Sequence, residues 1–499
     1  MKRKTWLYIL LSILTPTVVL ATEPEKGASF INSIDQGFSS FVDVIFNILF
    51  FSIGGFPLII LWLIIGAFFF TIRMQFINIY GFKHAIDILR GKYDDPEAQG
   101  EVSHFQALAT ALSGTVGLGN IAGVAVAVSM GGPGAVLWMT IAGFFGMTSK
   151  FLECTLAQKY RIIKPDGSVS GGPMRYLSAG LAEMGQRTLG RVLAVVFSIL
   201  CISAAFGGAN MFQANQSYGA VSNVLPGLPS WVYGLVLVVL VGLVIIGGIQ
   251  RIGRVAGTLV PLMCLLYILA CLFILLTNLT EIPGAIVTII SGAFAPKAVE
   301  GGIIGVIIQG FQRSAFSNEA GVGSAAIAHS AARTDEPIRE GLVALLEPFI
   351  DTIVVCNMTA LVIVITKAYN AEEFAALREA KKGAELTAAA FGTVLAWFPV
   401  LLAIAVFCFA FSTMISWSYY GERCWDYLSG GKGLIIYKSL FLIATFVGSV
   451  SNPSSVINFS DATLLSMAFP NILGGYFLCA QVAKDLQNYM DRLRMGILT

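Results

Sequence analysis

The chain has 499 residues, of which 56% are hydrophobic and only 12% are charged, and its mean hydropathy is +0.78. Because soluble domains usually carry about 25% charged residues, this composition excludes a large soluble domain and indicates an all-α membrane protein with many spanning helices. The net charge of +2 and the lack of a basic tract give no support to nucleic-acid binding.

Residues that commonly carry chemistry are scattered along the chain. The eight cysteines stand singly in apolar runs without metal-ligand or redox spacing, so we interpret them as small buried hydrophobic side chains. His84, His104 and His329 are far apart, which argues against a metal cluster. The apolar segments contain no zinc-binding His-Glu motif and no haem-ligand pattern. We therefore expect no enzymatic activity and no cofactor.

The N-terminus has the pattern of a secretory signal peptide. Three basic residues, Lys2 to Lys4, precede the short apolar stretch Trp6 to Leu20, and residues 19–21 offer a cleavage site. We predict a signal peptide over residues 1–21. The alternative is an uncleaved extra helix.

Eleven further segments are apolar enough for spanning helices, which need about 20 residues. They are 47–72, 103–128, 134–158, 192–217, 231–248, 256–277, 301–330, 338–366, 388–419, 434–450 and 454–480. Most Lys and Arg residues fall in the loops that we assign to the cytoplasm, and those of the opposite side lie mainly in 367–387. This asymmetry predicts a multi-pass protein of the plasma (inner) membrane, with the N-terminus outside and the C-terminus in the cytoplasm.

The second segment has features of a broken helix. Gly114, Gly117 and Gly119 lie within six residues in mid-segment, beside Ser113, Thr115 and Asn120. Each glycine in a helix interior costs up to about 1 kcal/mol, and unwound backbone in a bilayer is tolerated where it lines a cavity or is buried in protein. The alternative interpretation is close helix packing through small residues.

The seventh segment repeats this pattern. A polar run from Ser314 to Glu319 interrupts it, and Asn-x-Ala-Gly-Val occurs both at 120–124 and at 318–322. The predicted topology runs these two segments in opposite directions, and each opens a block of five helices. We therefore predict inverted five-helix repeats with the site where the two broken helices meet. The predicted parts are a leading helix with a cytoplasmic loop (22–102), a first repeat (103–277), and a second repeat with a cytoplasmic tail (278–499).

The break in the second segment predicts a particular chemistry. Free N–H groups at Gly117 to Asn120 would attract a carboxylate, and released carbonyls at Ser113 and Val116 would bind a hard cation. Sodium requires several oxygen ligands, and the ninth segment offers hydroxyls at Ser412, Thr413 and Ser416. The alternative for these hydroxyls is bonding back to the carbonyls of their own helix.

Four linked motifs resemble the alanine or glycine:cation symporter family. They are the run from Thr110 to Val124, Phe-Ser-Asn-Glu-Ala-Gly at 316–321, Gly-Ala-Asn-Met-Phe-Gln-Ala-Asn at 208–215, and Ser-Thr-Met-Ile-Ser-Trp-Ser-Tyr-Tyr-Gly-Glu at 412–422. The resemblance implies a fold like that of the leucine transporter with an extra leading helix. It also implies that sodium is coupled to uptake of alanine or glycine.

The resemblance also implies site residues. Asn120, Gln213 and Trp417 would line the substrate site, and Phe206 and Phe316 would close it. Together with the break, the predicted substrate-binding set is Thr115, Gly117, Gly119, Asn120, Gln213, Phe316 and Trp417. The predicted sodium-binding set is Ser113, Val116, Ser412, Thr413 and Ser416.

Several charged residues fall in apolar segments, where an unpaired charge costs several kcal/mol. They are Glu153, Arg313, Glu319, Glu347, Asp351 and Asp461. We predict that Lys150 pairs with Glu153, and that Arg313 pairs with Glu347 or Asp351 or else guards the outer vestibule. Glu319 is expected to bond free backbone N–H groups at the second break.

The sequence thus predicts a sodium-coupled symporter that carries a small neutral amino acid across the lipid bilayer into the cell. One alternative is a proton-coupled carrier in which Glu319 or Asp461 titrates. The other is an ion channel, which conducts without saturating.

Overall fold

The computed structural model describes residues 42–43, 46–47, 50–95, 97–165, 167–294 and 302–497. The predicted signal peptide lies outside the described residues. The leading group of elements is β1 (Ser52–Ile53), β2 (Phe56–Pro57), α3 (Leu58–Arg73), α4 (Ile77–Tyr80) and α5 (Phe82–Leu89). The two strands form a short antiparallel hairpin in front of α3.

The middle group contains the first predicted repeat. Its elements are α6 (His104–Thr115), the π-helix η1 (Gly119–Gly123), α7 (Val124–Gly131), α8 (Ala135–Lys159), the antiparallel pair β3 (Ile162–Ile163) and β4 (Val169–Ser170), α9 (Pro173–Glu183), α10 (Arg187–Phe206), the π-helix η2 (Gly207–Met211), α11 (Phe212–Val224), α12 (Ser230–Ile245) and α13 (Gly248–Thr277).

The last group contains the second predicted repeat. Its elements are η3 (Leu279–Glu281), α14 (Ile282–Phe294), α15 (Gly302–Asn318), α16 (Ala325–His329), α17 (Pro337–Ala344), α18 (Leu346–Pro348), the π-helix η4 (Phe349–Cys356), α19 (Asn357–Ile365), η5 (Glu372–Phe374), α20 (Ala375–Glu379), α21 (Gly383–Gly392), α22 (Phe398–Ser429), α23 (Leu434–Val450), α24 (Pro453–Ser466) and α25 (Ala468–Arg494).

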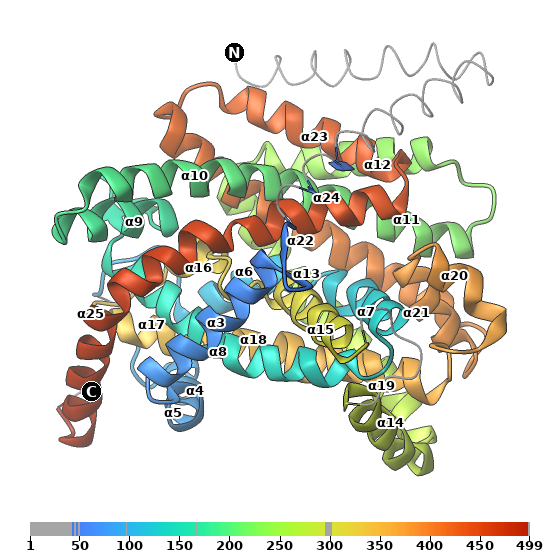
Figure 1. Cartoon of the computed structure of the whole chain (residues 1–499). Coiled ribbons are helices and arrows are strands. Elements are labelled where there is room, and N and C mark those ends of the chain that lie inside the picture. Colours follow the sequence, from blue (N-terminus) through green and yellow to red (C-terminus); the bar gives the residue numbers. More distant parts are fainter. Residues whose placement is uncertain are drawn as a thin grey trace.

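Helices from both halves of the chain form one bundle (Figure 1). α22 packs against α10, α11 and α13, and α8 packs against α15, α16 and α17. The bundle is apolar on the outside, as the large exposed side chains Leu262, Leu265 and Leu269 of α13 illustrate. Many polar side chains lie inside, because in a bilayer a polar group must find its partners within the protein.

Six helices or runs of consecutive helices among the described residues are long and apolar enough to cross a membrane, and the bent pair of α6 with η1 and α7 raises this to seven. Four shorter apolar helices accompany them, namely Leu58–Arg73, Ser230–Ile245, Leu279–Phe294 and Leu434–Val450. The predicted number of eleven spans is therefore not confirmed. Several predicted segments form helices of fewer than 18 residues, and the seventh predicted segment is divided between α15 and α16.

Both predicted helix breaks are present in the structure. A capping box of Ser103 and Gln106 starts α6, which ends at Thr115, and the axis bends by 54° before the chain continues through η1 and α7. The second break follows Asn318, where Glu319 has a φ of 56°. A positive φ is incompatible with a right-handed helix, so α15 ends there and the helix resumes at α16.

The bundle is closed at the end that the basic-residue distribution assigns to the cytoplasm. The chain before α6 pairs with the chain after α16 through backbone hydrogen bonds, from Glu101 N to Ala331 O at 2.9 Å and from Arg333 N to Val102 O at 2.7 Å. The two segments approach so closely at Gly100 that a Cβ there would lie 2.5 Å from Arg333 Cα.

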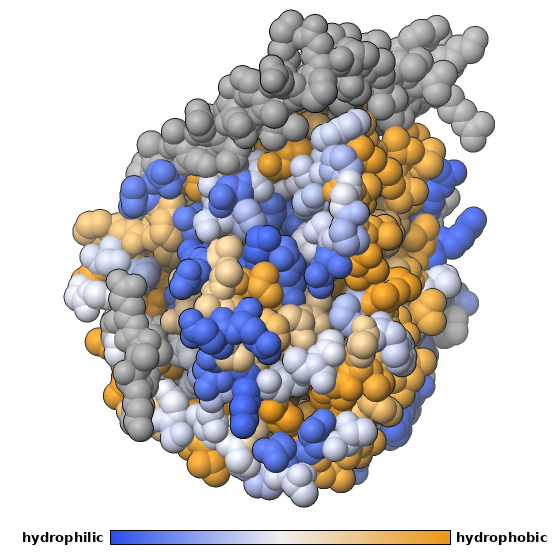
Figure 2. Space-filling model, turned by 90° about the vertical axis from the view of Figure 1, so that its right-hand side faces the viewer, coloured by the Kyte–Doolittle hydropathy of each residue, from blue (hydrophilic) through white to orange (hydrophobic). Residues whose placement is uncertain are grey.

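The opposite end is also closed over the first break. α21 lies against η1, where Thr387 Oγ1 donates to Ile121 O at 3.2 Å. A Cβ on Gly383 would lie 2.2 Å from Ala122 O, so this contact requires glycine. Figure 2 views the molecule from the right-hand side of Figure 1 and shows hydrophilic side chains gathered in the middle of that face. The residues of the predicted site are buried between these two closed ends.

Candidate transport site

The first break diverts two backbone amides from their helical partners. In a continuous helix these amides would bond to the carbonyls four residues earlier. Instead, Gly117 N donates to Asn120 Oδ1 at 3.0 Å, and Leu118 N donates to Gln213 Oε1 at 3.2 Å. The carbonyl of Ser113 is thereby released from the helix, while both buried amides stay satisfied. The side chains of Asn120 and Gln213, two residues predicted to bind substrate, therefore stabilise the non-helical backbone of the break.

Hydroxyl groups from α22 meet this break. Ser113 Oγ lies 2.7 Å from Ser412 Oγ and 2.7 Å from Ser416 Oγ. Thr413 Oγ1 is buried without a hydrogen-bond partner among the described residues, and a Cβ on Gly117 would lie 2.5 Å from it. The structure therefore brings together four of the five residues predicted to bind sodium, namely Ser113, Ser412, Thr413 and Ser416. The hydroxyl of Thr413 has no other partner among the described residues.

The other predicted residues of the break have different surroundings. Val116 leaves the helical conformation with a ψ of 84°, as expected where α6 ends. Thr115 Oγ1 donates to Ala111 O of its own helix at 3.3 Å, so this hydroxyl is engaged locally. A Cβ on Gly119 would lie 3.1 Å from Ser317 Cα, which shows how closely the two broken helices approach one another.

Asp351 of η4 joins the two broken helices. Its carboxylate accepts hydrogen bonds from Asn120 Nδ2 at 2.7 Å, from Ser317 Oγ at 2.7 Å and from the neighbouring Thr352 Oγ1 at 2.8 Å. Asn120 belongs to the first break and Ser317 lies one residue before the end of α15. Sequence reasoning missed this role, because a single carboxyl group in an apolar segment does not indicate which helices face it.

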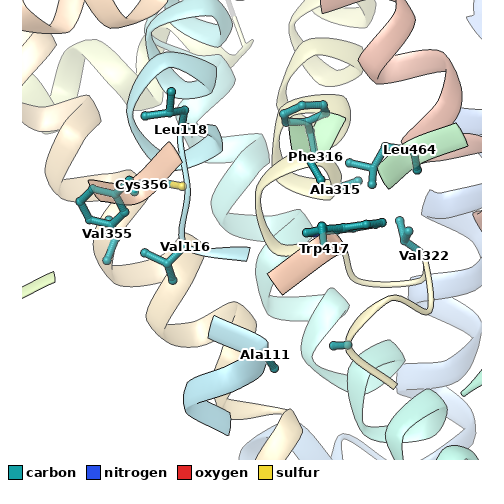
Figure 3. Close-up of a cluster of buried hydrophobic side chains, with 14 of the residues drawn as sticks. Ala111, Val116, Leu118, Ala315, Phe316, Val322, Val355, Cys356, Trp417 and Leu464 are labelled. Carbon is teal, nitrogen blue, oxygen red and sulfur yellow. The ribbon is translucent and has the colours of Figure 1, made fainter. Parts of the chain in front are cut away.

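Trp417 and Phe316 form an apolar wall beside the second break. Figure 3 shows the Trp417 ring below Phe316, with Leu464 and Val322 next to it. Trp417 is fully buried, and its Nε1 donates to Glu319 Oε1 at 3.0 Å. The indole is thereby held in one orientation by a residue of the break, as a wall that discriminates by shape requires.

Phe206 lies apart from this wall. Its ring stacks on Tyr437 of α23 with a centroid distance of 5.6 Å. Phe316 instead meets Phe212 of α11 in an edge-on contact with a centroid distance of 4.9 Å. Of the two aromatic residues expected to close the site, Phe316 is therefore the one beside Trp417.

The predicted pairing of Lys150 with Glu153 was wrong. Lys150 Nζ lies 3.2 Å from Glu347 Oε1 of α18, and Glu153 Oε2 accepts a hydrogen bond from Asn471 Nδ2 at 2.8 Å. Spacing along a helix favours the local pair by only a few tenths of a kcal/mol, which a fully buried partner on a neighbouring helix outweighs.

The predicted partners of Arg313 were also wrong. Arg313 pairs with Asp461 of α24, which in addition accepts a hydrogen bond from Gln312 Nε2 at 2.7 Å. The predicted partners Glu347 and Asp351 are occupied by Lys150 and by the helix joint described above. Glu319 differs from its prediction as well, because it accepts hydrogen bonds from the side chains of Trp417 and Ser324.

Comparisons with known proteins show that this chain is similar to transporters. The sodium/alanine symporter AgcS of Methanococcus maripaludis is 41% identical over 87% of this chain and 94% of its own length. The amino-acid carrier protein AlsT of Bacillus subtilis is 35% identical over 87% of this chain and 90% of its own length. These names are those of transporters rather than enzymes.

The fold has a solved counterpart. The crystal structure of MhsT in complex with L-phenylalanine superposes with a TM-score of 0.53 and covers 76% of this chain and 88% of MhsT, at 15% identity. At this identity the likeness shows the fold alone, a helical bundle of the leucine-transporter type. Residues 36–498 match the sodium:alanine symporter family as a whole, which confirms the resemblance found in the motifs. The chain therefore belongs to the sodium:alanine symporter family.

Proposed function

We propose that this protein couples sodium entry to the uptake of a small neutral amino acid, alanine or glycine. The observation that carries the proposal is the meeting of three features where the two breaks approach one another. Released backbone groups and the hydroxyls of α22 lie at the first break, and the aromatic wall of Trp417 and Phe316 lies beside the second. A Cβ on Gly119 of the first break would lie 3.1 Å from Ser317 Cα, next to Phe316. A zwitterionic substrate requires hydrogen-bond donors and acceptors, and a cation requires oxygen ligands. Selectivity for a small side chain requires a wall that limits its size, so the three features together suit co-transport.

The carboxylate of the substrate is proposed to bind the amides of Gly117 and Leu118. Each amide now donates to an amide oxygen, of Asn120 and Gln213 respectively. A carboxylate oxygen accepts the same hydrogen bonds and adds charge, so it would replace these oxygens without leaving a buried N–H group unpaired. The freed side-chain oxygen of Gln213 would then be available to the ammonium group.

Sodium is proposed to bind between α6 and α22 as a co-transported ion. Its oxygens would be the carbonyls of Ser113 and Val116 and the hydroxyls of Ser412, Thr413 and Ser416. Neutral oxygens suit a monovalent cation that must later leave, because they bind it without fixing a full negative charge in the bilayer. The unpartnered hydroxyl of Thr413 supports this assignment.

We include the predicted architecture in this proposal, because it supplies the movement that transport requires. Eleven spans, with inverted repeats opened by α6 and α15, would let one bundle rock against the other around a fixed site. Lys and Arg placement favours an outer N-terminus and a cytoplasmic C-terminus. A fluorescent protein fused after Thr499 should then glow in cells, and a dark but stably inserted fusion would contradict this orientation.

The function is tested by uptake of labelled alanine into proteoliposomes. An inward sodium gradient should drive accumulation above equilibrium, and the rate should saturate with alanine concentration. A potassium gradient of the same size is the control. Accumulation with a proton gradient but without sodium would favour the proton-coupled carrier, and flux that does not saturate would favour a channel.

A further inference from the structure

Five buried side chains form a chain of ionisable groups between the second break and the inner end of α6. We name this set, His104, Lys150, His329, Glu340 and Glu347, the inner charged cluster. Each member is at most 2% exposed. They come from α6, α8, α16, α17 and α18, which pack against one another (Figure 1). Ionisable groups at such a position are costly and call for a function.

The contacts run without interruption through the cluster. Glu340 lies between two imidazoles, with Oε2 against His104 Nδ1 and Oε1 against His329 Nδ1. The other ring nitrogen of His329, Nε2, lies 3.7 Å from Glu347 Oε2. Glu347 Oε1 in turn lies 3.2 Å from Lys150 Nζ. His329 is therefore placed between two carboxylates.

Charge balance favours a bound proton in the cluster. With both histidines neutral, two carboxylates face one ammonium, which leaves an unbalanced negative charge in a dry interior. Such a charge is strongly unfavourable when it is unpaired. One added proton makes the five groups neutral. His329 is the natural position for it, since an imidazolium there interacts with both Glu340 and Glu347.

Neighbouring groups do not remove this requirement. Side chains that interact electrostatically with members of the cluster include Glu153, Cys154, Arg161, Glu319, Asp351 and Tyr420. Three of these are carboxyl groups, which supply no positive charge. The cation Arg161 interacts with Asp335 as well as with Glu340, and its guanidinium donates to the backbone carbonyls of Ser330 and Ala332. The need for a bound proton therefore remains.

We propose that the inner charged cluster is a proton-binding site, and that its proton holds the inner end of α6 closed. His104 is the first residue of α6 and meets the cluster through Glu340. With the proton bound, the closed cluster is neutral and stable. Without the proton, the cluster carries an excess negative charge, which favours access of water to its carboxylates. Water enters when the inner end of α6 moves away from α17. A group that binds its proton more tightly in the closed state stabilises that state at low pH and loses this effect as the pH rises.

This inference rests on the proposed function in one respect, which is that a transporter must open its inner end to release substrate. It goes beyond that function, because the proton is neither the coupling ion nor part of the substrate site. Low cytoplasmic pH is expected to retain the closed form, and high pH is expected to favour inner opening.

Hydrogen exchange of residues 104–115 in the purified full chain tests the proposal without substrate. Exchange at pH 6 and at pH 8.5 is compared after correction for the intrinsic pH dependence of amide exchange. The corrected rate should rise with pH, by up to about tenfold for each unit over which one linked proton is lost. His329→Gln keeps a polar side chain but cannot hold the proton, so its rate should be independent of pH.

His84→Gln is the matched control, because His84 donates to or accepts from Tyr489 at 2.8 Å outside the cluster, and it should keep the pH dependence. A pH-independent wild-type rate would overturn the proposal, and so would a wild-type-like rise in His329→Gln. If that variant does not fold, Glu340→Gln decides instead, because it leaves Glu347 and Lys150 balanced without a bound proton and should also remove the pH dependence. Sodium-driven alanine uptake by the same preparation separates the two proposals, since each measurement can fail while the other succeeds.

Discussion

The two broken helices reach the centre of the bundle with opposite chemistry. The break after α6 is built from glycines and neutral side chains, and its diverted amides bond to Asn120 and Gln213. The break after α15 begins at Glu319, whose carboxyl group accepts from Trp417 and which leads through α16 to the inner charged cluster. The neutral first break suits reversible binding of an ion and a zwitterion, whereas we propose that the inner charged cluster beyond the second break controls closure.

The largest expected effect comes from filling the neutral break. Gly117→Val would place a Cβ 2.5 Å from Thr413 Oγ1, inside van der Waals contact and within the proposed sodium site. We expect sodium-driven alanine uptake to be abolished while the protein level is retained. The matched control is Gly123→Ala in the same break, because its nearest neighbour lies 3.9 Å away. Normal uptake by Gly117→Val would show that the break is not the site.

The joint between the two breaks should be nearly as sensitive. Asp351→Asn removes a charged acceptor from Asn120 and Ser317 and turns an NH2 group toward one of these donors. Losing a hydrogen bond to a buried charged group costs about 1.5–3 kcal/mol, so the uptake rate should fall by about tenfold or more. Asp426→Asn, in a partly exposed pair with Lys164, is the control. Equal uptake rates in Asp351→Asn and Asp426→Asn would show that transport does not depend on the hydrogen bonds of Asp351 to the two broken helices.

The first break and the hydroxyl groups of α22 were predictable because each depends on residues that are close together in the sequence. Three glycines beside Ser113 and Asn120 indicate an unwound helix, and Ser412, Thr413 and Ser416 indicate a polar patch on α22. The partners of the buried charged residues were predicted poorly. The partners of Lys150, Arg313 and Asp351 come from other helices, and spacing along one helix does not show which helices pack together.

A smaller effect is expected at the aromatic wall, in selectivity rather than rate. Trp417→Leu removes bulk beside Phe316 and should admit valine or leucine with some loss of alanine affinity. A difference of one methylene in a pocket is worth about 1–3 kcal/mol, so the preference for alanine over leucine should fall by at least about tenfold. The control is Trp62→Leu, whose Nε1 donates to Ala468 O at 3.1 Å. Unchanged exclusion of leucine by Trp417→Leu would show that Trp417 does not limit size.

The smallest expected effect concerns one sodium ligand. Thr413→Ala removes a hydroxyl without a partner among the described residues, so folding should be little affected. Losing one ligand of several should weaken sodium by about 1 kcal/mol and raise the half-maximal sodium concentration about fivefold. Ser418→Ala is the control on the same helix, because Ser418 Oγ donates to Ile415 O at 2.7 Å. The same sodium dependence in both variants would remove Thr413 from the site.

The central claim is that the neutral break binds sodium and the amino acid together. The most direct measurement is the affinity of the purified protein for alanine, by calorimetry, in sodium chloride and in potassium chloride at equal ionic strength. Because coupling between two ligands is reciprocal, alanine should bind much more tightly in sodium, and this gain should shrink in Thr413→Ala. An alanine affinity that is the same in both salts would contradict the account.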